Sequence, residues 1–278
     1  MLANHIVLGT DVIGHAIMEE LVTRGELVRM VNRSGQMEEV PAGVEVFASD
    51  LYDPASVIEA TRGAKVVYQS AQPRYDEWSG KFPPLQKYII EGLTGSNAKL
   101  VIVENLYAYG EVQGPITEDL PRNTHTRKGK VRAQLSAAAL DAHRAWKVRV
   151  AIGRASDYFG PWGINSSMGG IVFNNLLKGN SAQIAGSASV PHTFTYIPYF
   201  GKTLVILGER DEADGQAWHV PNDIPCITQG ELIQMIAEEM GGKAWVQAAG
   251  GCPTAPRSAH PAHRCQAAPR KDGNSRQP

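Results

Sequence analysis

Residues 4–34, NHIVLGTDVIGHAIMEELVTRGELVRMVNRS, decide the fold of this chain. A short apolar run at 6–8 is followed by a turn at 9–14 with a glycine at each end, and then by apolar residues at helical spacing. Gly25 closes the helical pattern, and a second apolar run covers 27–31. Strand, glycine turn, helix and strand in this order predict the first βαβ unit of a dinucleotide-binding fold.

The glycine turn fixes its residue types by geometry. Gly9 makes the tight turn, Gly14 lets the helix lie close to the strand, and the helix N-terminus offers free N–H groups to a pyrophosphate. Asp11 stands where the fingerprint has its second glycine. Its carboxylate either crowds and repels the phosphates or caps the helix. The residues expected at the cofactor phosphates are Gly9, Thr10, Asp11, Val12, Ile13 and Gly14.

The end of the second strand indicates which dinucleotide is bound. Sites that prefer NAD usually place an acidic residue roughly 20 residues beyond the glycines, but this chain has Asn32, Arg33 and Ser34 there. A guanidinium fits a 2′-phosphate in a bidentate fashion, so NADP is the expected cofactor and NAD is the alternative. Arg33 has a second interpretation, as an ordinary surface residue at a strand end.

The composition suits one large α/β domain or a Rossmann domain with a smaller lobe, because 43% of the residues are hydrophobic. A formal net charge of −1 lacks the excess of positive charge that is typical of nucleic-acid-binding proteins. No apolar run reaches membrane-spanning length and no signal peptide precedes the first strand, so we expect a cytoplasmic protein without a membrane partner. Three widely spaced cysteines predict neither a disulfide framework nor a metal site.

Strands and helices continue to alternate after the first unit. Apolar runs at 44–47, 65–68, 100–103 and 148–152 predict four more strands, with helical patterns between them. Six βα alternations in this order predict an α/β fold with a doubly wound parallel Rossmann sheet. The loop expected at 69–84 is long enough to carry function.

The chain divides into three expected segments. Residues 1–153 form an NAD(P)-binding Rossmann core, and residues 154–242 form a smaller C-terminal substrate lobe that can exchange elements with the core. Within this lobe, Thr228 and Glu231 have the spacing of a capping box at the start of a helix. Residues 243–278 are rich in Ala, Pro, Gly and Arg without periodicity, which predicts a disordered tail.

Several motifs resemble those of a known family. The matching segments are VLG at 7–9 with Gly14, SDL at 49–51, VVYQSA at 66–71, ENLYAYG at 104–110 and RASDYFGP at 154–161. On these segments the chain resembles the extended short-chain dehydrogenase/reductases, the NAD-dependent epimerase/dehydratase family, over about residues 4–242. The resemblance implies that Asp50 contacts adenine with Leu51 beside it. It also implies that Ser70, Ala71 and Gln72 line the cofactor. The tail resembles nothing in the family and has the character of a foreign or out-of-frame ending.

The catalytic residues depart from the family pattern. Family members use a Ser or Thr after the fifth strand and a Tyr-x-x-x-Lys on the next helix, where the Lys lowers the pKa of the phenol. Alignment puts Asn105 at the serine position, Thr126 at the tyrosine position and Lys130 at the lysine position. A threonine hydroxyl is far too weak an acid to replace a phenol unless something activates it, so the usual chemistry is unsupported.

Three alternatives stay open for the chemistry. Tyr107 or Tyr109 brings a phenol into the site, His125 acts as the base, or Asn105 and Lys130 hold a cofactor without redox chemistry. The catalytic candidates are therefore Lys130, Asn105, Thr126 and Tyr107, of which Lys130 is also a cofactor-binding candidate. The substrate candidates are Tyr75, Trp78, Tyr107, Tyr158 and His192.

Together these features predict an atypical NAD(P)-dependent oxidoreductase or epimerase-like enzyme acting on a small carbonyl or sugar-nucleotide-like compound. The alternative is a non-catalytic NADP-binding sensor or regulator on the same fold. The expected partner is a small-molecule substrate, and a homodimer is left open.

Overall fold

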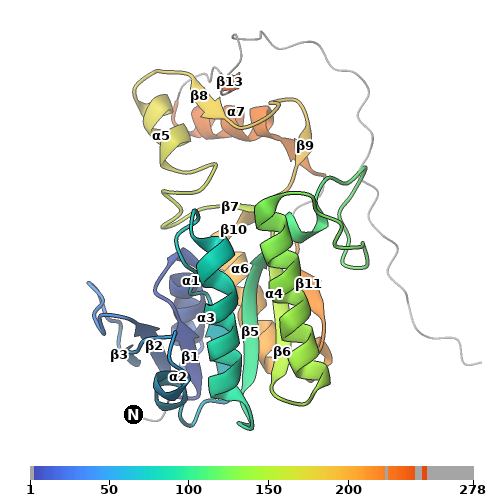
Figure 1. Ribbon diagram of the computed structural model, residues 1–278. Helices are drawn as coiled ribbons and strands as arrows, with labels where there is room; N and C mark the ends of the chain where they lie inside the picture. The colour runs from blue at the N-terminus through green and yellow to red at the C-terminus, as the bar shows by residue number, and fades with distance from the viewer. Residues whose placement is uncertain (1–2, 223–224, 242–245, 249–278) are drawn as a thin grey trace, which may run out of the picture.

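A computed structural model describes residues 3–222, 225–241 and 246–248 of the chain (Figure 1). The strands of its central sheet are β1 His5–Leu8, β2 Val28–Asn32, β3 Val44–Ala48, β4 Val66–Gln69, β5 Lys99–Asn105, β6 Arg149–Ala155 and β11 Ala217–His219. They pair in parallel in the order β11-β6-β5-β4-β1-β2-β3. The chain winds outward from β1 in both directions, which confirms the predicted doubly wound α/β sheet.

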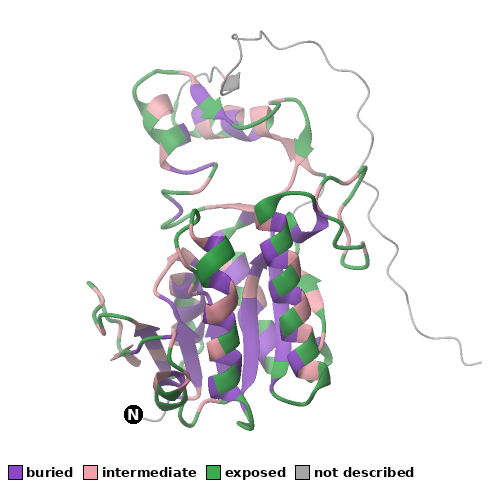
Figure 2. Ribbon diagram, viewed as in Figure 1, coloured by how far each residue is buried: buried purple, intermediate pink, exposed green. Residues whose placement is uncertain are grey.

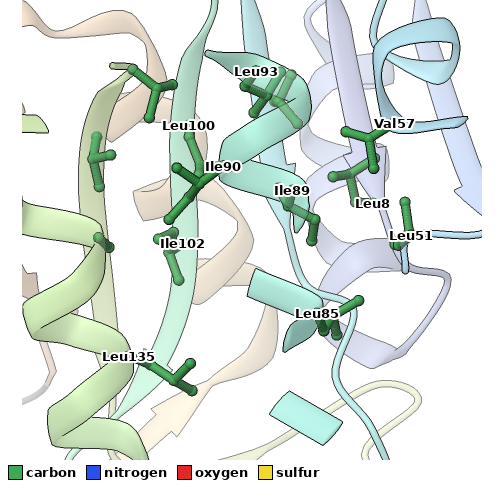
Figure 3. Packing of buried hydrophobic residues seen from close by; sticks show 14 of the residues in the cluster. Leu8, Leu51, Val57, Leu85, Ile89, Ile90, Leu93, Leu100, Ile102 and Leu135 are labelled. Carbon is green, nitrogen blue, oxygen red and sulfur yellow. The ribbon is translucent and has the colours of Figure 1, made fainter. Parts of the chain in front are cut away.

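Helices cover both faces of this sheet (Figure 1). They are α1 Val12–Thr23, α2 Pro54–Ala60, α3 Trp78–Leu93, α4 Arg127–Arg144 and α6 Ile197–Glu209. α1 and α6 pack together on one face, so closely that a Cβ added at Gly201 would lie 2.5 Å from the Ala16 carbonyl oxygen. α2, α3 and α4 cover the other face, where Leu8, Ile89 and Leu100 belong to one hydrophobic cluster (Figure 3).

Two neighbouring inner strands, β1 and β4, are buried along their whole length, as parallel strands covered on both faces should be (Figure 2). Every residue of β1 and of β4 is buried. No helix within the described ranges is long and apolar enough to cross a membrane.

A smaller lobe follows β6 and lies above the carboxyl ends of the central strands in Figure 1. Its elements are β7 Asp157–Phe159, α5 Gly170–Leu177, β8 Ala182–Ile184, β9 Pro191–His192, β10 Phe194–Tyr196, β12 Ile227–Thr228, α7 Gln229–Glu239 and β13 Val246–Ala248. Its own apolar cluster includes Met168, Val172 and Ile233. Between these elements the chain returns to the core, because α6 packs on α1 and β11 pairs with β6. Two 3₁₀ helices, η1 Tyr107–Tyr109 and η2 Asp211–Ala213, complete the described structure.

Local signals located the start of α7 correctly. The Glu231 amide donates to the Thr228 hydroxyl at 3.1 Å, and the Thr228 amide donates to the Glu231 carboxylate at 2.7 Å. This reciprocal pair is the predicted capping box.

The predicted C-terminal boundary of the loop at 69–84 was wrong, because α3 already begins at Trp78 and contains Pro83 and Pro84. Trp78 is buried, and its ring lies edge-on to that of Phe82 with centroids 5.5 Å apart. Packing of these aromatic rings outweighs the loss of the two amide donors that the prolines lack. Tertiary contacts therefore overrode the sequence signal for a loop.

Within the predicted tail, residues 246–248 form the short strand β13. β13 pairs in parallel with β8, and Val246 packs against the apolar cluster of the lobe. The segment looked unstructured because its pairing partner lies far earlier in the sequence. Residues 249–278 of the predicted tail lie outside the described residues.

Candidate functional site

A cleft of about 630 Å³ lies at the carboxyl ends of the central strands. It lies beside the switch point between β1 and β4, where doubly wound sheets bind their ligands. The predicted site residues that line it are Asp11, Val12, Ile13, Ser70, Gln72, Tyr75, Trp78, Asn105, Tyr107, Thr126, Tyr158 and His192. Those outside its lining are Gly9, Thr10, Gly14, Asn32, Arg33, Ser34, Asp50, Leu51, Ala71 and Lys130.

The glycine turn between β1 and α1 has no room for side chains. Gly9 has a φ of +118°, and a Cβ there would lie 2.6 Å from both the Ala71 amide nitrogen and the Ser70 hydroxyl oxygen. A Cβ on Gly14 would lie 2.3 Å from the Gly9 carbonyl oxygen. Both glycines are therefore needed for α1 to start close to the end of β4.

Asp11 caps α1 at the edge of the cleft. Its carboxylate accepts a hydrogen bond of 2.9 Å from the Gly14 amide, so the carboxylate uses one of the free N–H groups at the helix start. Burial raises the pKa of Asp11, while the Gly14 amide, the Ser70 hydroxyl and the His15 ring act in the opposite direction. The side chain thus caps the helix, which is one of the two predicted roles.

Polar residues at the end of β2 and after β3 accept hydrogen bonds within the turns that follow them. The Asn32 carboxamide oxygen accepts from the Gly35 amide at 2.7 Å, and the Asp50 carboxylate accepts from the Tyr52 amide at 3.0 Å. Arg33 is exposed beside these turns, outside the cleft lining. This arrangement leaves the Arg33 side chain open to solvent.

At the other end of the cleft, the residues aligned with the catalytic positions have structural partners. Thr126 is the N-cap of α4, and its hydroxyl accepts from the Gly129 amide at 3.0 Å. The Asn105 carboxamide oxygen accepts from the Tyr107 amide at 3.1 Å. Lys130 is exposed and lies outside the cleft lining, so the helix turn does not bring it together with Thr126 in the cleft.

Tyr107 supplies a phenol to the cleft, but its surroundings do not activate it. Burial, followed by the neighbouring Tyr75, raises the pKa of Tyr107, and Asp157 acts in the same direction. Arg132 is the group that opposes these effects. A phenol with a raised pKa stays protonated at neutral pH and can donate a hydrogen bond, but it cannot act as a base.

The cation that α4 places in the cleft is Arg132, which the sequence did not identify. Its side chain is buried, and its guanidinium carbon lies 4.3 Å from the centroid of the Trp78 ring. The available signal was the spacing of the buried positions Val131, Arg132, Leu135 and Ser136, which share one helix face. Arg132 lies within a run of basic residues at 127–132, and such a run is equally typical of a solvated helix start.

A buried polar network behind the cleft was also missed. Arg154 is 2% exposed and donates to Glu104 at 2.9 Å, to the Tyr109 hydroxyl at 2.6 Å and to the Ser136 hydroxyl at 2.5 Å. The Tyr109 hydroxyl also lies 2.8 Å from His219 Nε2. These contacts tie β5, β6, α4 and β11 together and explain why Tyr109 is inside the protein rather than in the cleft.

His192 and Asp157 form an imidazole–carboxylate pair on the lobe side of the cleft. His192 Nε2 lies 3.0 Å from Asp157 Oδ2, and both residues line the cleft. A carboxylate in this position fixes the orientation of the imidazole ring. Within the described ranges, no three His, Cys, Asp or Glu side chains gather as metal ligands would.

A comparison with models of protein families concerns the part of the chain that forms the cofactor end of the cleft. Residues 9–145 match the family model described as NAD(P)H-binding. The chain therefore carries an NAD(P)H-binding domain, although the match does not distinguish NADP from NAD. A comparison with curated protein sequences finds no significant match.

Solved structures share the fold over most of the chain. UDP-glucuronic acid 4-epimerase from Bacillus cereus has a TM-score of 0.76 at 16% identity, and the match covers 88% of this chain and 85% of the epimerase chain. dTDP-glucose 4,6-dehydratase from Bacillus anthracis has a TM-score of 0.75 at 15% identity, with 88% and 84% covered. UDP-N-acetylglucosamine 4-epimerase from Methanobrevibacter ruminantium has a TM-score of 0.76 at 18% identity, with the same coverage of 88% and 84%. The predicted resemblance to the NAD-dependent epimerase/dehydratase family is thus confirmed at the level of fold.

Proposed function

We propose that this chain is an NAD(P)-dependent oxidoreductase or epimerase-like enzyme that acts on a small carbonyl or sugar-nucleotide-like compound. The observation that supports it most is the cleft itself. One continuous lining connects the cap of α1 at Asp11 with the His192–Asp157 pair. The proposed cofactor site and the proposed proton-carrying pair would therefore open into the same space.

The cofactor-side residues fit a dinucleotide. Gly9 and Gly14 form a cradle that any Cβ would fill, and the start of α1 lies directly behind it. The turn 9–14 would hold the pyrophosphate, and 32–34 would hold the ribose with its 2′-phosphate. Asp50 and Leu51 would lie at adenine, while Ser70, Ala71 and Gln72 would line the nicotinamide half. When bound, the nicotinamide supplies hydride transfer.

His192 is the proposed proton carrier. The family's proton carrier is a tyrosine with a lowered pKa, whereas here Thr126 stands at that position and the pKa of Tyr107 is raised. His192 would give a proton to the substrate oxygen or take one from it, and Asp157 would hold the ring in place. Asn105 would donate a hydrogen bond to the same oxygen through its amide nitrogen.

Oxidation of NADPH with a panel of aldehydes, ketones and nucleotide sugars would test this proposal. His192→Asn should lower turnover by roughly 10²- to 10⁴-fold, the usual scale for a general acid or base, without weakening NADPH binding. Asp157→Asn should lower turnover less, because it leaves the imidazole in place. A comparable loss in His125→Asn, with His192→Asn unaffected, would favour the exposed His125 as the base instead.

The second candidate is a non-catalytic NADP-binding sensor. It is favoured by the threonine at the tyrosine position and by the exposure of Lys130. Tight NADPH binding without oxidation by any compound of the panel would support the sensor and contradict the enzyme.

A further inference from the structure

Arg132 is a buried guanidinium that lines the cleft with hydrogen-bonding capacity to spare. It is 5% exposed. Nη1 donates to the Val103 carbonyl at 3.3 Å and Nη2 donates to the Gln72 side chain at 3.1 Å, whereas Nε has no partner among the described residues. A guanidinium carries five N–H donors in a planar fork. Donors are therefore left for a ligand in the cleft.

Within residues 3–222, 225–241 and 246–248, no carboxylate pairs with Arg132 alone. Glu104 is the acidic side chain that raises its pKa, yet Glu104 bonds Arg154 at 2.9 Å. Two buried guanidinium groups thus share one carboxylate. Burial of an unmatched charge is costly, and burial lowers the pKa of Arg132 to about 10.

The other acidic groups in the cleft are already engaged. Asp11 accepts from the Gly14 amide at 2.9 Å, and Asp157 lies 3.0 Å from His192. Neither makes an ion pair with Arg132. An anion that enters the cleft would therefore complete the charge pairing that the protein leaves open.

Aromatic rings hold the guanidinium and extend beside it. The Arg132 guanidinium carbon lies 4.3 Å from the Trp78 centroid and 4.7 Å from the Phe82 centroid. The Tyr75 ring lies edge-on to Trp78 with centroids 5.0 Å apart, and it lines the same cleft. Stacking fixes the direction of the fork, and the rings offer an apolar wall for the body of a ligand.

We propose that Arg132 anchors a carboxylate or phosphate of the substrate, whose body packs against Tyr75 and Trp78. This inference rests on the proposed function, because it assigns an anionic substrate class to the same cleft. The oxyanion belongs to the substrate and not to the cofactor. The pyrophosphate is expected at the start of α1, whereas Arg132 comes from α4 on the opposite face of the sheet.

Calorimetric titration of the full chain with three probes would test the proposal. Benzoate and phenyl phosphate present the two oxyanions on a ring, and benzamide presents the same ring without charge. Wild type should prefer the anions. Arg132→Met should weaken anion binding roughly 10- to 100-fold, the scale of charge-assisted hydrogen bonds, and should remove the preference over benzamide.

Two further variants show whether position or mere charge matters. Arg127→Met removes an exposed charge from the same helix and should keep the affinities of wild type. Arg132→Lys keeps the charge without the fork and should fall between wild type and Arg132→Met. An equal loss of anion affinity in Arg127→Met would overturn the proposal. Equal affinity of wild type for benzoate and benzamide would also overturn it. So would a wild type that binds none of the probes at millimolar concentration.

Titration in saturating NADP separates the two sources of an oxyanion. Anion binding that survives NADP supports a substrate subsite, whereas displacement by NADP would assign Arg132 to the cofactor and overturn the proposal. Thermal unfolding adds a structural readout. Arg132→Met should unfold at the same or a higher temperature, and a clear decrease would show a structural role instead. Failure of wild type to bind NADP would remove the proposed function, while failure of the anion probes alone would remove this subsite.

Discussion

The two ends of the cleft use their polar side chains in different ways. At the cofactor end, carboxylates and carboxamides bond to backbone amides two or three residues away. Asp11 accepts from Gly14, and Asp50 accepts from Tyr52. Such contacts form turns and caps, and the Ser70 hydroxyl adds one contact between elements by donating to the Leu8 carbonyl at 3.2 Å.

At the catalytic end, Thr126 and Asn105 make similar local contacts, but the two buried arginines bond across elements. Arg154 and Glu104 are 50 residues apart in the chain, and Arg132 and Gln72 are 60 residues apart. The caps and turns at the cofactor end are therefore set mainly by local sequence, whereas the arginine contacts at the catalytic end form only once the sheet has formed. Substitutions at the two ends should accordingly differ in what they damage.

The largest expected effect is at Arg154. Arg154→Met would leave Glu104 buried without its partner and should lower the free energy of unfolding by about 3–5 kcal/mol. Urea denaturation would measure it, with Arg132→Met as the matched control because it removes the same group from a site without a paired carboxylate. Similar decreases in the free energy of unfolding in both variants would contradict the view that only Arg154 has a paired carboxylate that it stabilises.

At the cofactor end, Arg33 should affect binding and not stability. Arg33→Ala should weaken NADP binding by about 1.5–3 kcal/mol, the scale of hydrogen bonds to charged groups, because the exposed guanidinium would lose the 2′-phosphate. NAD binding and the melting temperature should stay almost unchanged. Equal weakening of NAD and NADP binding, measured by titration, would contradict the assignment.

Asp11 should weaken dinucleotide binding through its charge. Asp11→Asn keeps a capping group and should tighten NAD binding by about 1–3 kcal/mol, from the loss of repulsion at surface-like dielectric. Asp11→Gly should do the same at the cost of the cap. An unchanged affinity in both variants would show that the carboxylate points away from the phosphates.

The same residue predicts how binding depends on pH. Because the pKa of Asp11 is raised in the folded protein, this group's contribution to folding stability is present below the ordinary carboxyl pKa and is lost as pH rises through the raised value. Over the same range the Asp11 carboxylate gains or loses its charge. NAD affinity should therefore increase as pH falls toward the raised pKa, because the repulsion disappears, and Asp11→Asn should flatten this pH dependence. NAD is the better probe, because the 2′-phosphate of NADP titrates near pH 6 itself.

Sequence reasoning succeeded where the signal was local and failed where it was not. The glycine turn and the capping box at Thr228 were readable because their partners lie within a few residues. Arg132 was hidden within a basic run, since its burial depends on Trp78 from another helix. The early start of α3 was likewise set by aromatic packing. The roles assigned to the predicted site residues stay predictions.

β13 gives the smallest test of the same distinction. Its sequence carries no strand pattern, so its order depends on pairing with β8 and on the contact of Val246 with the lobe. A chain ending at Gly242 should be less stable than one ending at Ala248 by about 1 kcal/mol, the scale of burying part of one valine side chain.

Comparing these two truncations isolates residues 243–248, which include the three residues of the strand, because both lack everything after residue 248. Urea denaturation would measure the difference, and NADP titration should show none, since β13 lies in the lobe away from the glycine turn. Equal stability would mean that the lobe does not need this long-range pairing. A loss of NADP binding in the shorter chain alone would mean that the lobe and the cofactor end are coupled, and the contrast between local and long-range parts of the cleft would then fail.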